Sequence, residues 1–192
     1  AQWSTPLKVA ALEGFASNSC FFWSQNTTEP YKGFQKGRRW DMLNSDIGII
    51  RQRVPELEYI SPMLFGGSGD KNVIRGEKGD SYQVKGCYPE YDLIEKSKIA
   101  KGRFINDIDI DEQRKVCIIG ERVAEVLFDQ GENAIGELIK VNGIYFQVIG
   151  VAGKMSNVSI GGSNDESVIL PFLDLRAAAE RAALEQFVAG CG

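Results

Sequence analysis

Apolar and polar residues recur along the chain in patterns that predict short helices and strands. Ile47 and Ile50 are placed at helical spacing, so residues 45–53 are predicted to form an amphipathic helix that ends at Pro55. Trp40 alternates with polar neighbours in the stretch before this helix, a pattern typical of a strand. Two flanking strands are therefore predicted, at residues 39–43 and 57–64.

A second block, from residue 72 to residue 96, is rich in β-forming residues. Residues 72–77 and 81–85 are predicted to be strands joined by a turn at Gly79 and Asp80, because glycine and aspartate favour turns. A short helix is predicted to follow at residues 89–96.

The clearest pattern lies between residues 115 and 131. Residues 115–119 contain a continuous apolar run, which predicts a buried strand. Gly120 turns the chain into a predicted helix at residues 121–130, and Gly131 provides its C-terminal stop. Within this helix one face is apolar, formed by Val123, Ala124, Leu127 and Phe128.

The last third of the chain contains a strong hairpin signal. Residues 137–141 and 144–151 flank Asn142-Gly143, a pair that tolerates the positive φ angles of a type I′ turn. A strand is predicted at residues 167–170, followed by an Ala-rich closing helix at residues 175–188 with charge pairs at helical spacing. Mixed helices and strands with an antiparallel hairpin predict an α+β fold.

Glycine-rich stretches at residues 66–70 and 161–165 are predicted to be flexible loops. The composition predicts that the chain is folded nearly throughout, because 43% of its 192 residues are hydrophobic and 25% are charged, as in ordinary globular proteins. The formal net charge of −4 argues against a nucleic-acid partner, which would require a basic face. The chain contains no apolar run long enough to span a bilayer. It begins with Ala1 rather than Met, so the sequence leaves open whether further segments flank it.

No catalytic, cofactor-binding or metal-ligating residue is predicted. The chain has no histidine, which removes the usual general base and the usual zinc ligand, and no glycine-rich stretch matches a phosphate-binding loop. Four cysteines are widely separated; Cys117 is predicted to be a buried small hydrophobe, and a Cys20–Cys87 disulfide stays open as the weaker alternative. We therefore expect a protein that is not an enzyme and carries no cofactor.

Two further groups of residues could suggest binding sites, and each has a simpler interpretation. An acidic group lacks the glycine and the glutamate that a calcium-binding EF-hand requires, so it is interpreted as a solvated turn. An aromatic group is interpreted as core packing, because no basic groove accompanies it. The acidic group is Asn106, Asp107, Asp109, Asp111 and Glu112, and the aromatic group is Phe21, Phe22, Trp23, Tyr31, Phe34 and Trp40.

A series of short motifs in a fixed order covers roughly residues 31–172. Each motif alone arises often by chance, whereas the ordered set does not. The segments are Pro30-Tyr31-Lys32-Gly33-Phe34, Val54-Pro55-Glu56-Leu57-Glu58, Val84-Lys85-Gly86, Tyr88-Pro89-Glu90-Tyr91, Gly102-Arg103-Phe104-Ile105, residues 115–120, Leu127-Phe128, Ile135-Gly136, residues 141–151 and Ile169-Leu170-Pro171-Phe172. Together they resemble the MacB-like periplasmic core domain of FtsX/MacB-type ABC transporter permeases, in a variant similar to that of Bacteroidetes-type bacteria.

This resemblance implies a periplasmic domain of an inner-membrane protein. The family fold is a porter-like βαβ lobe with an inserted smaller β-rich lobe, which would place the start of the porter-like lobe at residues 1–64 and the inserted lobe at residues 65–172. Residues 173–192 would hold a C-terminal helix, as a truncated or atypical return to the porter-like lobe.

The implied function is non-catalytic coupling of cytoplasmic ATP hydrolysis to substrate export or to a periplasmic partner. The implied partners are a cytoplasmic ATPase subunit, reached through one membrane helix before the domain and three after it, and a periplasmic adaptor or lipoprotein. The full-length permease is expected to be a dimer. The alternative from another class is a stand-alone periplasmic module that binds a small ligand or a partner.

Overall fold

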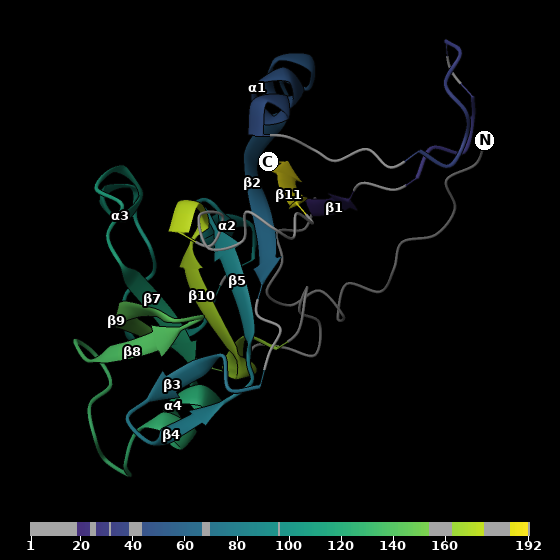
Figure 1. Ribbon diagram of the computed structural model, residues 1–192. Helices are drawn as coiled ribbons and strands as arrows, with labels where there is room; N and C mark the ends of the chain where they lie inside the picture. Colours follow the sequence, from purple (N-terminus) through teal and green to yellow (C-terminus); the bar gives the residue numbers. More distant parts are fainter. Residues whose placement is uncertain are drawn as a thin grey trace, which may run out of the picture.

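The structure, a computed structural model, describes residues 19–23, 26–30, 32–38, 44–66, 70–95, 97–153, 163–174 and 185–191. Within them, eleven strands form one mixed sheet in the order β1-β11-β2-β5-β10-β7-β9-β8-β3-β4, with β6 paired to β9 (Figure 1). The strands are β1 Ser19–Trp23, β2 Leu57–Gly66, β3 Val73–Arg75, β4 Lys78–Asp80, β5 Gln83–Cys87, β6 Ile99–Gly102, β7 Val116–Gly120, β8 Leu138–Val141, β9 Ile144–Ala152, β10 Ser167–Pro171 and β11 Glu185–Cys191.

Short helices and a 3-10 turn accompany the sheet in the described part of the chain. They are α1 Asn44–Arg53, α2 Tyr91–Ile94, α3 Asp107–Asp111, α4 Glu121–Leu127 and η2 Asn164–Glu166. Parallel pairs, β5 with β10 and β7 with β9, occur beside antiparallel ones, and helices cover parts of the sheet. This mixture confirms the predicted α+β class.

The core lies on both sides of β7, as its continuous apolar run predicts. All five residues of β7 are buried. Cys117 and Ile119 face one cluster, which includes Val123 of α4, whereas Ile118 faces a second cluster, which includes Tyr91 of α2. Successive side chains of a strand point to opposite faces, so a strand covered on both faces must be apolar throughout. The predicted strand-to-helix unit is confirmed as β7 followed by α4, but the predicted end of the helix is wrong, because α4 ends at Leu127 with Phe128 in an extended conformation, before Gly131.

The predicted hairpin is confirmed as β8 and β9. Asn142 has a φ of 47° and Gly143 a φ of 88°, the pair of positive angles that a type I′ turn requires. Ile139 and Phe146 lie opposite each other and are both buried. The turn therefore sets the register that directs the apolar side chains into the core.

The predicted turn at Gly79 and Asp80 is wrong, because both residues lie in β4. The chain instead turns at Gly76, whose φ is 57°. A Cβ on Gly79 would lie 2.9 Å from the carbonyl oxygen of Val73, so this glycine permits a close approach of β4 to β3.

The predicted closing helix at residues 175–188 is wrong where the structure describes it. Residues 185–188 belong to strand β11, which lies between β1 and β2, and the rest of that helix falls outside the described residues. Pairing on both edges of β11 outweighs the local helix propensity. The predicted strand at residues 39–43 also lies outside the described residues.

The acidic group at residues 106–112 is not a solvated turn. It forms α3, whose first turn is closed by a capping box between Asn106 and Asp109. Asp109 is buried and accepts hydrogen bonds from Arg103, with Arg103 Nη2 2.9 Å from Asp109 Oδ1. This ion pair holds the pKa of the Asp109 carboxyl below its usual range.

The predicted aromatic core can be compared with the structure at Phe22 and Phe34, whereas Tyr31 and Trp40 lie outside the described residues. Phe34 is 56% exposed. The guanidinium of Arg38 lies over its ring, 4.3 Å from the ring centroid. Phe22 is half-buried against Ile60. The interpretation as core packing is therefore wrong for Phe34.

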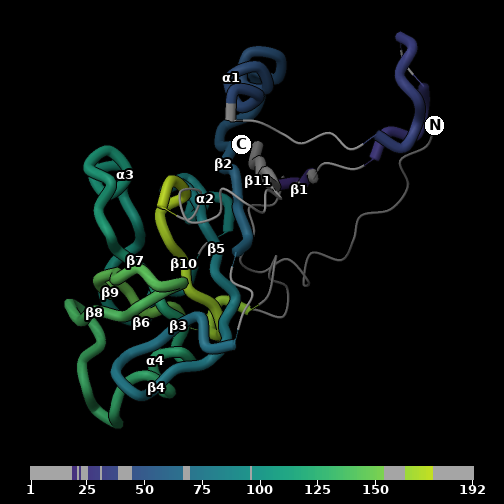
Figure 2. The backbone as a smooth tube through the Cα atoms, in the orientation of Figure 1, coloured from purple at the N-terminus to yellow at the C-terminus, as the bar shows by residue number. Residues whose placement is uncertain are grey.

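Both ends of the described chain, in β1 and β11, lie at one end of the sheet (Figure 1), and the tube in Figure 2 shows β1 on the same side of the molecule as α1. Ser19 pairs with Gly190, and Cys191 pairs with Leu57 at the start of β2. The ten residues of β2 then lead away from this end over about 33 Å. At the far end, Gly66 pairs with Val84 of β5.

Candidate interaction site

The described residues that border the two predicted glycine-rich loops lie at the same end of the sheet. Gly66 pairs with Val84, and the neighbouring Gln83 pairs with Ser167, the first residue of β10. The end of β2 and the start of β10 therefore lie at the same end of the sheet, on either side of β5. Of the predicted loops, Gly66 lies in β2 and residues 164–165 lie in η2, while residues 67–69 and 161–162 are outside the described residues.

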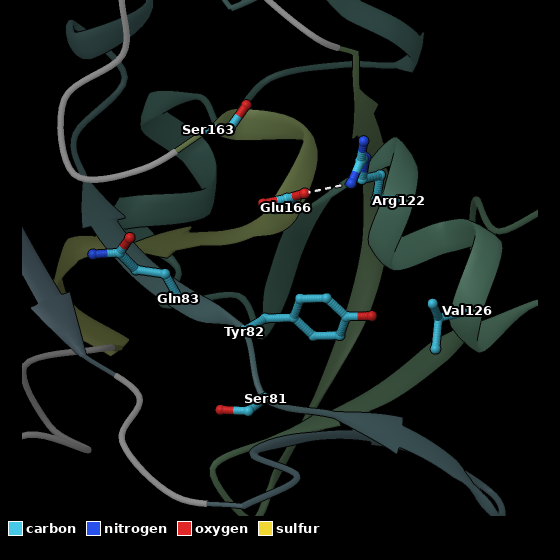
Figure 3. A pocket seen from close by; sticks show the side chains of 7 residues that line it. All are labelled: Ser81, Tyr82, Gln83, Arg122, Val126, Ser163 and Glu166. Carbon is cyan, nitrogen blue, oxygen red and sulfur yellow. Dashed lines mark hydrogen bonds and ion pairs between the residues drawn. The ribbon is translucent and has the colours of Figure 1, made fainter.

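A pocket of about 470 Å³ opens beside these segments (Figure 3). Its walls come from the β4–β5 connection, from α4 and from η2. The side chain of Tyr82 points across it toward Val126 of α4 (Figure 3). The lining residues are Ser81, Tyr82, Gln83, Arg122, Val126, Ser163 and Glu166.

Tyr82 is fixed in place by a pair of hydrogen bonds to one side chain. Asn72 Nδ2 donates to the Tyr82 carbonyl oxygen at 2.6 Å, and the Tyr82 N–H donates to Asn72 Oδ1 at 2.8 Å. Burial, together with the nearby carboxylates Asp80 and Glu166, raises the pKa of the Tyr82 phenol. The pocket therefore presents a neutral aromatic hydroxyl.

The opposite wall depends on Gly120, which joins β7 to α4. A Cβ at this position would lie 2.1 Å from the carbonyl oxygen of Asp165, so only glycine lets η2 rest on the start of α4. Arg122 in the first turn then reaches η2, with its Nη1 2.6 Å from Glu166 Oε1 and its Nε 3.6 Å from Asp165 Oδ2. This contact holds α4 and η2 together at the rim.

Behind the rim lies a buried polar network that no local sequence pattern indicates. Lys85 is 1% exposed, Asn164 1% and Glu95 0%. Lys85 Nζ donates to Asn164 Oδ1 at 2.8 Å, and Asn164 Nδ2 lies 3.5 Å from Glu95 Oε1. Tyr91 of α2 donates its hydroxyl to the other oxygen of Glu95. The network thus joins β5, η2 and α2.

Burial shifts both charged groups of this network toward neutrality. It raises the pKa of Glu95 to about 7 and lowers the pKa of Lys85 to about 8, although each partner opposes the shift of the other. A lysine of lowered pKa can act as a nucleophile, but Lys85 is enclosed and lines none of the pockets described here. The network therefore has a positioning role for η2.

No group of three or more histidine, cysteine, aspartate or glutamate side chains among the described residues is arranged to hold a metal ion. Cys20, Cys87 and Cys117 are free thiols; Cys20 is exposed, whereas Cys87 is buried. Cys117 is buried as predicted, and burial raises the pKa of its thiol.

The sequence of the chain matches the profile of one known protein family. The profile of the MacB-like periplasmic core domain matches residues 10–189. The chain belongs to this family. In the part of the chain that the structure describes, no helix is long and apolar enough to cross a membrane.

Relatives of the MacB-like domain are much longer proteins. The chain is 31% identical over 117 residues to the macrolide export ATP-binding/permease protein MacB of Bdellovibrio bacteriovorus, covering 61% of this chain and 17% of that protein. It is 23% identical over 164 residues to the pyoverdine export ATP-binding/permease protein PvdT of Pseudomonas entomophila, covering 85% of this chain and 24% of that protein. The chain thus spans about a quarter or less of these two relatives.

Solved structures agree on the fold. The periplasmic region of MacB from Actinobacillus actinomycetemcomitans matches with a TM-score of 0.72 at 16% identity, covering 96% of this chain and 79% of that one. The extracellular domain of the ABC-type transporter YknZ from Gram-positive bacteria matches with a TM-score of 0.67 at 17% identity, covering 91% and 83%. With the family match over residues 10–189, the chain is an extracytoplasmic domain of the kind found in ABC transporter permeases.

Proposed function

We propose that this MacB-like domain couples ATP hydrolysis in the cytoplasm to substrate export or to a periplasmic partner, without catalysing a reaction itself. The observation that carries the proposal is the family match over residues 10–189, combined with a strand register that brings residues 19 and 191 to one end. A domain attached at that end presents the pocket and α4 at its other end, where a partner can reach them.

The proposed surroundings follow from the relatives, whose names join an ATP-binding part to a permease. The domain would belong to an inner-membrane protein, flanked by apolar segments of about 20 residues. Its partners would be a cytoplasmic ATPase and a periplasmic adaptor or lipoprotein, in a dimeric permease.

We also propose the division into lobes that the family resemblance implies, with residues 1–64 opening the porter-like lobe, residues 65–172 forming the inserted lobe and residues 173–192 returning to the porter-like lobe. The larger buried cluster supports the inserted lobe, because its fully buried members lie between Val73 and Phe172 except for Leu64.

The test compares pocket variants with a surface control in the intact permease and its ATPase. Tyr82→Ala and Arg122→Glu should reduce export or partner control while ATP hydrolysis and assembly persist, because nucleotide chemistry takes place across the membrane. Tyr145→Ala is the control, since Tyr145 is 61% exposed and outside the pocket. Export at the wild-type level in both pocket variants would contradict the assignment of this surface, and a native gene without membrane segments would contradict the coupling function.

A second candidate is a module that binds a small ligand. It is favoured by the pocket volume of about 470 Å³, which is in the range of small-molecule sites. Thermal unfolding of the isolated chain with a panel of small polar compounds tests it. A compound that raises the melting temperature in the wild type but not in Tyr82→Ala would support this candidate.

A further inference from the structure

A second hollow lies on the other side of α4, between this helix, strand β6 and the segment at residues 129–134. Its volume is about 540 Å³. We call it the α4–β6 groove. Its apolar lining residues are Ala100, Ala124, Phe128, Ala134 and Val151, its carboxylates are Glu121, Glu125, Asp129 and Glu132, and its cation is Lys101; Gln130 and Gly131 complete it.

Two of the four carboxylates form ion pairs with cations on strands β3 and β4. Glu132 Oε1 lies 2.6 Å from Arg75 Nη2, and Asp129 Oδ1 lies 2.6 Å from Lys78 Nζ. The Lys78 pair holds the pKa of Asp129 below its usual range. The Asp129 N–H, which donates to Glu132, and the Arg75 guanidinium do the same for the pKa of Glu132, so both carboxyls stay ionised.

The other two carboxylates, Glu121 and Glu125, have no ion-pair partner among the described residues. They are one helical turn apart on α4, where like charges repel each other. Arg122 lies between them in sequence and lines a hollow together with both, but its guanidinium is paired with Glu166 and Asp165 of η2. The Glu121 carboxylate lies beside β9, because a Cβ on Gly153 would be 3.2 Å from its Oε1. The lip of the groove therefore carries negative charge that the described part of the chain leaves unmatched.

The floor beneath these carboxylates is apolar. Phe128 and Val151 belong to the larger core cluster, and Ala124 packs against it. The guanidinium of Arg75 covers the Phe128 ring, 4.3 Å from its centroid, which fixes the ring in place. An occupant that suits this groove combines apolar contact with positive charge, as the long stems and charged heads of lysine and arginine do.

We propose that the α4–β6 groove docks a basic amphipathic helical segment of a periplasmic partner protein. Its Lys or Arg heads pair with Glu121 and Glu125. Its apolar side chains rest on Ala100 and Ala124 and on the edges of Phe128 and Val151, which are only 4% and 6% exposed. The two carboxylates are spaced by about 6 Å along α4, which matches cations placed four residues apart on a helix. A second copy of this chain suits the groove less, because each copy carries a formal charge of −4. The inference rests on the proposed function only for the existence of a partner.

Binding of a synthetic probe to the isolated chain tests the groove. The probe is an amphipathic helical peptide of about 15 residues with lysines four residues apart beside a leucine face. We expect binding that weakens with added salt, and that weakens about tenfold in the double variant Glu121→Gln/Glu125→Gln. Both replaced residues are exposed, and thermal unfolding verifies that the double variant folds.

The matched control is Asp107→Asn/Asp111→Asn. These two carboxylates are also exposed and four residues apart on a helix, α3, and they line none of the pockets described here. Wild-type affinity in the control, with loss in the groove variant, supports the proposal. Equal loss in both would show unspecific attraction to an acidic surface and would overturn it, as would wild-type affinity in the groove variant.

Two other occupants are tested in the same samples. Sedimentation without peptide that shows a dimer in the wild type, lost in the groove variant, would assign the groove to a second copy. Displacement of the peptide by tetrabutylammonium at equal concentration would assign it to a small organic cation. Either result overturns the proposal. Export by the Tyr82 and Arg122 variants of the intact permease is a separate measurement, so failure of the groove and failure of the coupling function are distinguishable.

Discussion

The 3-10 turn η2 contacts two groups of charged side chains, one buried and one exposed. On the inner side, Lys85 and Glu95 are enclosed and hydrogen-bonded through Asn164. On the outer side, Arg122 is 61% exposed and meets Glu166 and Asp165. Enclosed charges lose their hydration and need their partners, whereas exposed charges keep water as an alternative partner. The inner set therefore fixes the position of η2, and the outer set stays available for contact.

The largest expected effect is that of breaking the enclosed set. Glu95→Ala removes the carboxylate to which Tyr91 donates and leaves a buried lysine, which should destabilise the domain by about 3 to 5 kcal/mol. Denaturant unfolding measures this loss. Glu125→Gln on the exposed face of α4 is the control and should change stability by less than about 0.5 kcal/mol.

A double replacement sharpens this contrast. Lys85→Met/Glu95→Leu removes both enclosed charges and keeps much of the side-chain volume, so most of the lost stability should return. Equal and additive losses from the two single replacements would show that the residues do not act as a pair.

The next largest effect is expected at Gly120, where the backbone packs against η2. Gly120→Ala places a Cβ 2.1 Å from the carbonyl oxygen of Asp165, so η2 must shift and stability should fall by about 1 to 3 kcal/mol. Gly48→Ala in α1 is the matched control, because nothing lies within 4 Å of its Cβ. It should raise helix propensity and stabilise the domain by about 0.5 to 1 kcal/mol. Equal changes at both positions in thermal unfolding would refute the close contact.

A smaller effect is expected from pH, with opposite signs for the two enclosed groups. Glu95 has a pKa of about 7 when folded, above its value when unfolded, so its contribution to stability is lost as pH rises from about 4.5 to 7. Lys85 has a pKa of about 8 when folded, below its value when unfolded, so its contribution returns as pH rises from about 8 to 10.5. We expect a stability minimum between about pH 7 and pH 8.

Denaturant midpoints measured across this range check the pH profile. In Lys85→Met/Glu95→Leu the minimum should disappear, because neither group remains. A minimum that persists in the double variant would assign it to other residues.

The smallest effect is expected on the outer side. Arg122→Ala should cost less than about 1 kcal/mol, because exposed ion pairs contribute little and salt screens them. The unfolding midpoint at low and high salt measures this. A loss as large as that of Glu95→Ala would show that the outer pair also holds η2 in place.

The parts of the fold that the sequence predicts are those determined locally. The five apolar residues of β7 and the Asn142-Gly143 turn carry their structure in their own residue types. Strand β11 does not, because residues 185–191 become a strand only through β1 and β2, which are distant in the chain. Its Ala-rich surroundings favour a helix until that pairing is known.

The enclosed network is the part of the candidate site that the sequence could not predict. Lys85 follows Val84 in a strand whose alternation favours an exposed lysine, yet β2 and β10 flank this strand and both of its faces are covered. Its partner Asn164 is 79 residues away.

The shared end of β1, β11 and β2 determines how the domain would respond to force. If partners pulled on α4 while the chain was held at residues 19 and 191, the load would run along these strands. Their hydrogen bonds lie across the strand direction, so the load would shear them. β11 pairs with β2 at seven positions, which would share the load rather than open in sequence. Such a joint acts as a stiff tether, and movement of the attached end would reach the far end with little stretching.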